Sequence, residues 1–334
     1  MDIILNYYYL SAILMLLASF IPLIIYLMYG REPKIQYNAN YEVELPTDDP
    51  PAVVNAIYDG LSKEVGEPDI NGFKATIMDI IDRNYLILTN KTSNGDYCSP
   101  GSLFLEINPE YDTDALWKFE EEILHFLREY EQDGIISMDL VSESLHYYNS
   151  ARFFKYTYNN WQKEVEKAVM EGNFKDTFHS KGDEYLKIFG LLGMVLALSA
   201  FFYALDPTRN AYSVLISSII LGVMALISII LPQKVAGQWT TYGREYYARW
   251  HNFKKYIEDY SLIKEYSPES VKVWNRYLVY ATALGVAEGV KRAMELSIPD
   301  DKLIENDIYS FDCYNDYISS LNDAEDTKPD SDKF

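Results

Sequence analysis

The side chains able to bind a transition metal or to attack a substrate are few and widely separated. Cys98 and Cys313 are too distant in sequence to form a metal knuckle, and Cys98 has no histidine nearby, so a structural thiol is its expected role. No two histidines lie four residues apart beside a glutamate, as in a zinc-protease helix. The histidines are His125, His146, His179 and His251. These spacings predict no metal site and no nucleophilic cysteine.

The sequence also lacks the motifs that mark other kinds of reaction centre. It has no phosphate-binding loop, no paired-glycine dinucleotide fingerprint and no Gly-x-Ser-x-Gly elbow. Carboxylates are so numerous that a chance pair carries no information, and Glu120–Glu122 is expected to be a solvated helix face. We therefore predict no catalytic, cofactor-binding or metal-binding residue, no cofactor and no enzymatic activity.

The charge of the chain is strongly negative, with a formal net charge of −21. Residues 30–185 hold 14 Lys/Arg against 30 Asp/Glu, and residues 232–334 hold 13 against 18. Binding to a phosphate backbone depends on clustered basic side chains. The composition therefore disfavours nucleic acid as a partner.

Three apolar runs are long enough to cross a hydrocarbon core of about 30 Å as helices, at residues 10–29, 188–205 and 211–231. The last two are joined by the short turn 206–210, so they form a helical hairpin, and the polar segments on either side must emerge on one face of the membrane. A cleaved signal peptide is the alternative for the first run. It is disfavoured because no Lys or Arg precedes that run and no clear small-x-small cleavage site follows it.

The basic residues near the apolar runs predict the orientation of the chain. Six of them lie on the side of the two large polar segments, and Arg209 alone lies on the other side, in the hairpin turn. The six are Arg31, Lys34, Lys181, Lys187, Lys234 and Arg244. We expect a multi-pass protein of the cell membrane, with a short extracellular N-terminus at residues 1–9 and the bulk of the chain in the cytoplasm.

The first polar segment, residues 41–110, is predicted to be a winged-helix-like unit. Apolar residues recur at helical spacing within 52–61 and 72–83, and two strands are predicted at 85–89 and 102–107, around a turn at 90–96. Two helices followed by a β-hairpin are typical of a winged helix. This unit gives the cytoplasmic module an α+β character.

The rest of the polar chain is predicted to be helical. Residues 111–180 look wholly helical, so the unit at 111–185 is expected to form a helical bundle, and residues 238–296 are expected to form C-terminal cytoplasmic helices. Residues 297–334 are acidic and contain little that could form a core, so this tail is expected to be partly disordered, at least over 323–334. The fold class is an α-helical membrane protein with an α+β cytoplasmic module.

Several segments resemble one family of membrane proteins, called domain of unknown function 2207. They are Gly30–Pro33 after the first span, the pair Pro50-Pro51 followed by 75–86 (ATIMDIIDRNYL), and the closing segment 274–287 (WNRYLVYATALGVA). The resemblance covers residues 10 to about 296, and it implies an architecture without any known activity, so it assigns no catalytic residue.

The chain departs from this resemblance in two places. Members usually begin with a signal peptide and a large extracellular β-rich domain, whereas little precedes the first span here. The family's tail is often rich in Gly and Ser, whereas this one is acidic. Any binding role of the extracellular domain is therefore not expected.

The expected function is that of a non-catalytic, membrane-anchored protein-interaction or scaffolding component in an archaeon or bacterium. Its partners would be the lipid bilayer and an unidentified cytoplasmic protein, and a homo-oligomer is possible. One alternative is an oligomeric permease subunit for a small solute or ion. It is disfavoured because a permease normally places polar or ionisable side chains inside the membrane, whereas these spans offer only serines. The small pairs Gly193/Ala197 and Ser218/Gly222 suit helix packing.

The second alternative is a membrane-tethered transcription regulator, in which the second helix of the winged-helix-like unit would enter a DNA groove. In residues 72–83 the charges are Lys74 and Arg83 against Asp79 and Asp82, so no positive face results. A winged helix used for contact with protein fits the charges better.

Overall fold

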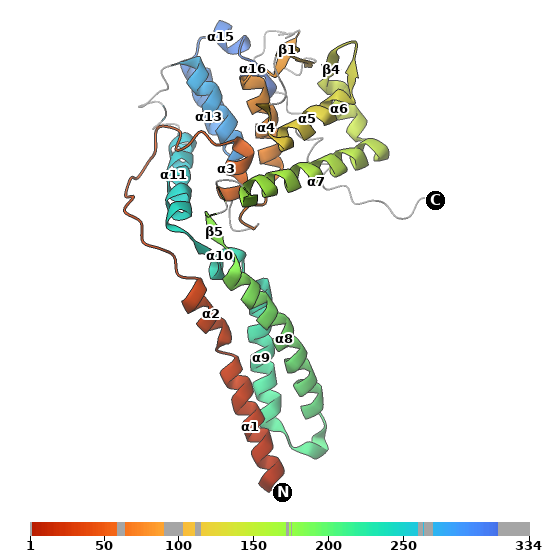
Figure 1. Cartoon of the computed structure of the whole chain (residues 1–334), viewed down its shortest axis with the longest axis vertical. Coiled ribbons are helices and arrows are strands. Elements are labelled where there is room, and N and C mark those ends of the chain that lie inside the picture. Colours follow the sequence, from red (N-terminus) through yellow and green to blue (C-terminus); the bar gives the residue numbers. More distant parts are fainter. Residues whose placement is uncertain are drawn as a thin grey trace. The chain divides into compact units, whose positions relative to one another are not determined.

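The computed structural model describes residues 2–58, 64–89, 103–110, 115–171, 174, 176–259, 263 and 270–312. The chain forms two compact units (Figure 1). Unit 1 comprises residues 1–36, 60–65 and 176–245, and unit 2 comprises residues 37–59, 66–175 and 246–334. The predicted turn at 90–96, Cys98, Cys313 and the disorder expected at 323–334 all lie outside the described residues.

Unit 1 contains the three predicted spans, which the structure confirms as helices. The candidate span Asn6–Tyr29 covers most of α1 (Asp2–Ala18) and all of α2 (Ile21–Tyr29), and the other two candidate spans are α8 (Lys181–Ala204) and α9 (Tyr212–Ile230). α8 begins seven residues before the apolar run because Asp183 and Glu184 lie in its first turn, where the helix dipole favours negative charge. The break between α1 and α2 comes just before Pro22, which lacks the N–H that would continue the helix.

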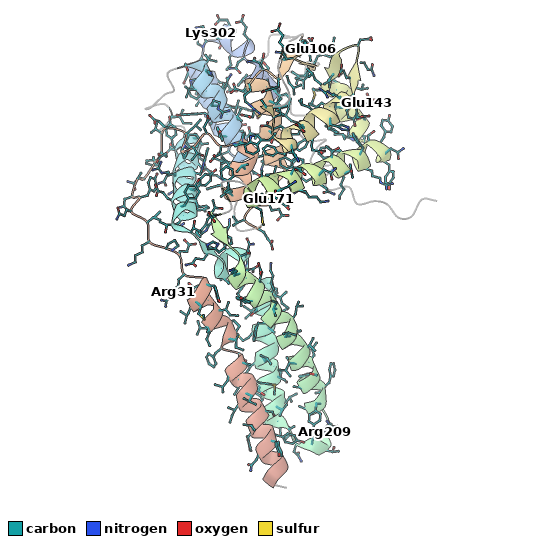
Figure 2. The ribbon with its side chains drawn as sticks, viewed as in Figure 1. Arg31, Glu106, Glu143, Glu171, Arg209 and Lys302 are labelled. Carbon is teal, nitrogen blue, oxygen red and sulfur yellow. The ribbon has the colours of Figure 1, made fainter. Side chains whose placement is uncertain are left out.

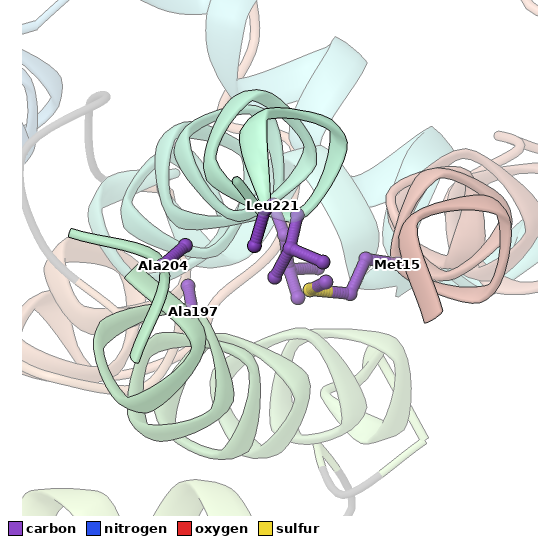
Figure 3. Packing of buried hydrophobic residues seen from close by; sticks show 6 residues of the cluster. Met15, Ala197, Ala204 and Leu221 are labelled. Atoms are coloured by element: carbon purple, nitrogen blue, oxygen red, sulfur yellow. The ribbon is translucent and has the colours of Figure 1, made fainter. Parts of the chain in front are cut away.

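Helix α9 packs against both α8 and α1. Small side chains on α8 face Leu221 of α9, and Met15 of α1 closes the same cluster (Figure 3). A Cβ added at Gly190 would lie 2.9 Å from the backbone oxygen of Ala225, so only glycine lets the two helices approach this closely. Close packing of small residues is how helices associate in lipid.

The turn between α8 and α9 is held by its own side chains. It contains the 3-10 helix η2 (Pro207–Arg209), and Asn210 follows in the left-handed conformation. The Arg209 guanidinium lies 3.9 Å above the Tyr203 ring and pairs with Asp206 at 3.2 Å (Figure 2). The charge of this arginine is therefore paired with groups of the turn itself.

The other end of unit 1 contains two very close backbone contacts. Strand β5 (Phe178–His179) precedes α8 and pairs antiparallel with β6 (Gln238–Trp239), which lies between α10 (Gln233–Ala236) and α11 (Thr241–Glu258). A Cβ at Gly182 would lie 2.0 Å from the Ala236 oxygen, and one at Gly243 would lie 1.9 Å from the Thr177 oxygen. Backbone therefore packs directly on backbone where α8 and α11 begin.

Unit 2 is an α+β assembly whose sheet has the order β1-β2-β4-β3, with every pair antiparallel. Its first part contains α3 (Pro51–Tyr58), α4 (Ile70–Asp82), β1 (Leu86–Thr89), β2 (Phe104–Ile107), α5 (Lys118–Arg128), β3 (Glu131–Gln132), β4 (Ile135–Ser137), α6 (Met138–Leu145) and α7 (Tyr148–Glu171). Its last part contains α13 (Val271–Ala283), α14 (Ala287–Ser297), α15 (Asp300–Ile304) and α16 (Asp307–Asp312).

Helix α4 forms the centre of unit 2. The Asp69 side chain caps it by accepting from the N–H groups of Asn71 at 2.9 Å and Gly72 at 3.3 Å. Every residue from Gly72 to Ile81 is buried, because α3, α5, α13 and α16 all contact this helix (Figure 1). The core around it is rich in aromatic rings, and Phe73 meets Trp161 at a centroid distance of 5.2 Å.

The two helices and the β-hairpin expected within 41–110 are present as α3, α4, β1 and β2, while the winged-helix class itself stays a prediction. The expectation that residues 111–180 are wholly helical was wrong. Strands β3 and β4 lie within that range, and β4 pairs with β2. The turn between them is Asp133-Gly134, with φ values of 52° and 83°, and an Asp-Gly pair is a strong hairpin signal.

The acidic tail also contributes more to the core than its composition indicates. Helix α16 buries Ile308, Tyr309 and Phe311 and contacts α4 and α13. The Tyr309 hydroxyl donates to Glu295 at 2.8 Å, and Asp312 pairs with Lys291 at 3.1 Å. The expectation of little core within 297–334 was therefore wrong for the part up to residue 312, where three large apolar side chains within four positions outweigh the surrounding acidity.

Candidate functional site

Five charged side chains, mostly buried, join helices α4, α5 and α13; we call them the charge network. Arg83 pairs with Asp79 at 2.8 Å and with Glu120 at 2.5 Å, so it connects α4 to α5. Arg276 of α13 pairs with Asp79 at 2.6 Å and lies 3.9 Å from Asp82. Asp79 therefore receives both guanidinium groups and lies at the centre of the network.

Arg276 also donates hydrogen bonds to two groups outside the charge network. It donates to the Tyr280 hydroxyl at 2.8 Å and to the exposed Asp48 at 3.0 Å. Asn275 donates to Asp82 at 3.4 Å. A planar guanidinium suits such a site because it can bond several acceptors at once. The arrangement fixes α13 against α4 over several side chains.

Burial changes the acidity of two carboxyl groups in the network. The Glu120 side chain is 1% exposed, and its burial raises the pKa of Glu120 to about 7, against the opposing effect of Arg83. Burial also raises the pKa of Asp82, and the charge of Arg276 opposes that rise. Removing water from a carboxylate disfavours its charged form.

A polar cavity of about 450 Å³ lies beside this network. The Asn306 side-chain N–H donates to Oδ1 of Asn275 at 2.5 Å, so the two amides bridge one wall of the cavity. The cavity is lined by Ile81, Asp82, Asn84, Val271, Asn275, Lys302, Glu305, Asn306, Asp307 and Ile308. Among the described residues, its lining offers hydrogen bonds from amides and carboxylates.

A second hollow lies between α5 and α7, and we call it the α5–α7 groove. It has a volume of about 460 Å³ and is open to solvent, with Tyr156 of α7 exposed over 64% of its surface. The lining residues are Glu121, Glu122, Leu124, His125, Arg128, Phe153, Tyr156, Thr157 and Asn160. The solvated face expected for Glu120–Glu122 does not include all three residues. Glu120 is buried in the charge network, whereas Glu121 is exposed.

The histidines remain apart in the structure. His125 lines the α5–α7 groove, His146 follows α6, and His179 lies in β5. His251 lies 3.0 Å from the Tyr58 hydroxyl through Nδ1 and stacks on Tyr247. Within the part of the chain that the structure describes, no three His, Cys, Asp or Glu side chains are placed to hold a metal ion.

The burial of α4 argues against the alternative in which this helix binds DNA. A helix that reads DNA must expose its side chains to the groove of the duplex. The residues of α4 from Gly72 to Ile81 are buried by other helices of unit 2, and Asp79 faces Arg83 and Arg276. This helix has no free face with which to read bases.

The seven serines of the predicted spans argue against the permease alternative. Six of the seven donate their hydroxyl hydrogen to a carbonyl of their own helix three or four residues earlier; they are Ser11, Ser19, Ser199, Ser217, Ser218 and Ser228. A hydroxyl bonded in this way is not directed at a solute. The described spans therefore show packing contacts and no line of free polar groups.

The charge network was not expected from the sequence. Its residues are separated by up to 197 positions, and the sequence alone places Asp79 and Arg83 only as charges on one helix. The two segments that resemble family motifs, 75–86 and 274–287, meet at this network, since α4 packs against α13. That coincidence is the one signal in the sequence that could have indicated the contact.

The comparisons with known proteins agree with the sequence resemblance. No curated protein and no solved structure matches the chain. The family described as predicted membrane protein (DUF2207), C-terminal domain, matches residues 38–294, well over half of the chain. The match includes both segments that meet at the charge network. The chain therefore belongs to this family of membrane proteins.

Proposed function

We propose that the protein is a non-catalytic, membrane-anchored protein-interaction component. The three spans anchor it in the bilayer, with the N-terminus outside, and unit 2 binds a protein partner in the cytoplasm. The observation that carries this proposal is the α5–α7 groove, an open hollow of about 460 Å³ with an exposed tyrosine at its rim.

The residues of the groove suit a contact between proteins. Tyrosine and arginine are enriched at the energetic centres of interfaces, and Tyr156 and Arg128 lie on opposite walls here. Other large side chains on α7 are also exposed, with Tyr148 at 51% and Tyr147, just before the helix, at 65%. A partner that covers the groove would bury Tyr156, and one that also extends along the start of α7 would cover Tyr148 and Tyr147.

Site-specific photocrosslinking in native membranes tests this proposal. A benzophenone amino acid at position 156 is expected to yield one discrete crosslinked product of higher mass. The same amino acid at Tyr41, which is 47% exposed and does not line the groove, is expected to yield none. Adding Glu122→Lys to the position-156 variant should remove most of the product, because it reverses a charge on the groove wall.

The mass of the product identifies the kind of partner. A product at twice the mass of the chain indicates self-association, and any other single mass indicates a different protein. The proposal is wrong if position 156 gives no product, or if positions 156 and 41 give the same pattern.

A further inference from the structure

The polar cavity beside the charge network is large enough for a small organic molecule. Its volume of about 450 Å³ falls within the range of about 300 to 1,000 Å³ found for small-molecule sites. Helices α4 and α13 supply part of the lining, and α15, α16 and the residues between them supply most of the rest. The α5–α7 groove is formed by other helices, so the two sites can be tested separately.

Asp82 presents to this cavity a carboxylate oxygen that has no hydrogen bond within the described part of the chain. The Asp82 side chain is 7% exposed. Its Oδ1 accepts from Nδ2 of Asn275 at 3.4 Å, whereas its Oδ2 lies 3.9 Å from Nη1 of Arg276, beyond hydrogen-bond distance. Buried polar atoms normally have at least one hydrogen-bond partner. Oδ2 is therefore available to a ligand in the cavity.

Arg276 cannot approach Asp82 more closely because other acceptors hold its guanidinium group. Nη1 pairs with Asp79 at 2.6 Å, and Nη2 donates to Asp48 at 3.0 Å and to the Tyr280 hydroxyl at 2.8 Å. The ion pair of Asp82 is thus the longest in the charge network. A buried carboxylate without a close partner is costly, so a cation bound beside Asp82 would stabilise the fold.

The charges of the lining also favour a cation. Among the described residues, the charged side chains that line the cavity are three carboxylates, Asp82, Glu305 and Asp307, and one ammonium group, Lys302. Such a lining attracts positive charge. No three His, Cys, Asp or Glu side chains of the described chain are placed to hold a metal ion. An organic cation fits the cavity better than a metal ion does.

The apolar side chains in the lining indicate the kind of organic cation. Ile81 and Ile308 are buried at 3% and 1% exposure and line the cavity, as does Val271. An alkylammonium ion offers methylene groups to these side chains and N–H donors to a carboxylate. Hydrogen bonds between an ammonium group and a carboxylate are short and strong, because both partners are charged.

We propose that this cavity binds a small aliphatic amine, whose ammonium group donates to Oδ2 of Asp82 while its methylene groups contact Ile81 and Ile308. A diamine suits the lining best, because Glu305 and Asp307 add negative charge for a second ammonium group.

Calorimetric titration of the full-length protein in detergent with diaminobutane at neutral pH tests this proposal. The wild type should bind the diamine, whereas butanediol, an uncharged molecule of the same chain length, should not bind. Asp82→Asn keeps the shape of the side chain but removes its charge, and it should weaken binding by about tenfold to one hundredfold. Asp48→Asn removes another partner of Arg276. It should bind as the wild type does, because Asp48 is 93% exposed and does not line the cavity.

Hydrogen–deuterium exchange of the wild type provides a test that needs no variant to fold. Diaminobutane should slow the exchange of amides in α15 and α16, because the bound amine would connect these helices to Asp82 of α4, and it should leave α7 unchanged. The proposal is overturned if Asp82→Asn binds the diamine as tightly as the wild type, since the diamine then follows only the general negative charge of the chain. It is also overturned if Mg²⁺ alone slows exchange in α15 and α16 as the diamine does, since the site would then hold a metal ion.

Discussion

Replacement of Arg276 by methionine is expected to lower the free energy of unfolding of unit 2 by about 3 to 5 kcal/mol. Methionine keeps most of the volume of the side chain but leaves Asp79 with one guanidinium and Asp82 with none. An uncompensated buried carboxylate costs far more than an exposed ion pair contributes. Chemical denaturation followed by tryptophan fluorescence measures the loss, since Trp161, Trp250 and Trp274 are buried in unit 2.

Two further variants separate the effect of charge from the effect of size. Arg128→Met removes an exposed arginine of α5 and should change stability by less than about 0.5 kcal/mol. Combining Arg276→Met with Asp79→Asn should recover part of the loss, because one of the unpaired charges is then gone. If Arg276→Met unfolds like the wild type, the charge network does not stabilise unit 2.

Replacement of Gly243 by alanine is expected to destabilise unit 1 by about 2 to 3 kcal/mol. The added Cβ would lie 1.9 Å from the Thr177 backbone oxygen, and a backbone atom cannot move aside as the end of a side chain can. The clash falls next to the β5–β6 pair, where the Thr240 N–H donates to the same Thr177 oxygen at 3.0 Å. Thermal unfolding in detergent, followed by the fluorescence of Trp239 in β6, should show a lower midpoint.

A second glycine provides the matched control for this variant. At Gly222 of α9 the nearest atom to an added Cβ is the Ala197 Cβ at 3.5 Å, which is an ordinary contact. Gly222→Ala should therefore leave the midpoint unchanged or raise it slightly, because alanine favours helix over glycine. Equal effects of the two substitutions would contradict the close backbone approach at Gly243.

The membrane part of the fold was predictable because its signal is local. Apolar runs identified all three candidate spans, and the structure differs in the residues at which the helices begin and end and in the break between α1 and α2. The small pairs Gly193/Ala197 and Ser218/Gly222 also contribute to the α8–α9 contact, where Gly222 faces Ala197. Composition and spacing within some 20 residues decide these features.

The parts that the sequence analysis missed depend on contacts between distant segments. The Asp133-Gly134 turn was a readable hairpin signal, but the strands beside it have only two and three residues and require β2 as a partner. The burial of Phe311 likewise depends on α4 and α13, which no local pattern reveals. The charge network is the extreme case, because Asp79 and Arg276 are 197 positions apart.

The spans contain no ionised group over residues 10–29, 188–205 and 211–231. The electric field across a membrane does work on charges that move within it, about 2.3 kcal/mol per elementary charge for each 100 mV. These apolar stretches carry no charge on which the field could act, and the serine hydroxyls in them are bonded to their own helices. The packing of these helices should therefore stay the same whether the membrane is energised or depolarised.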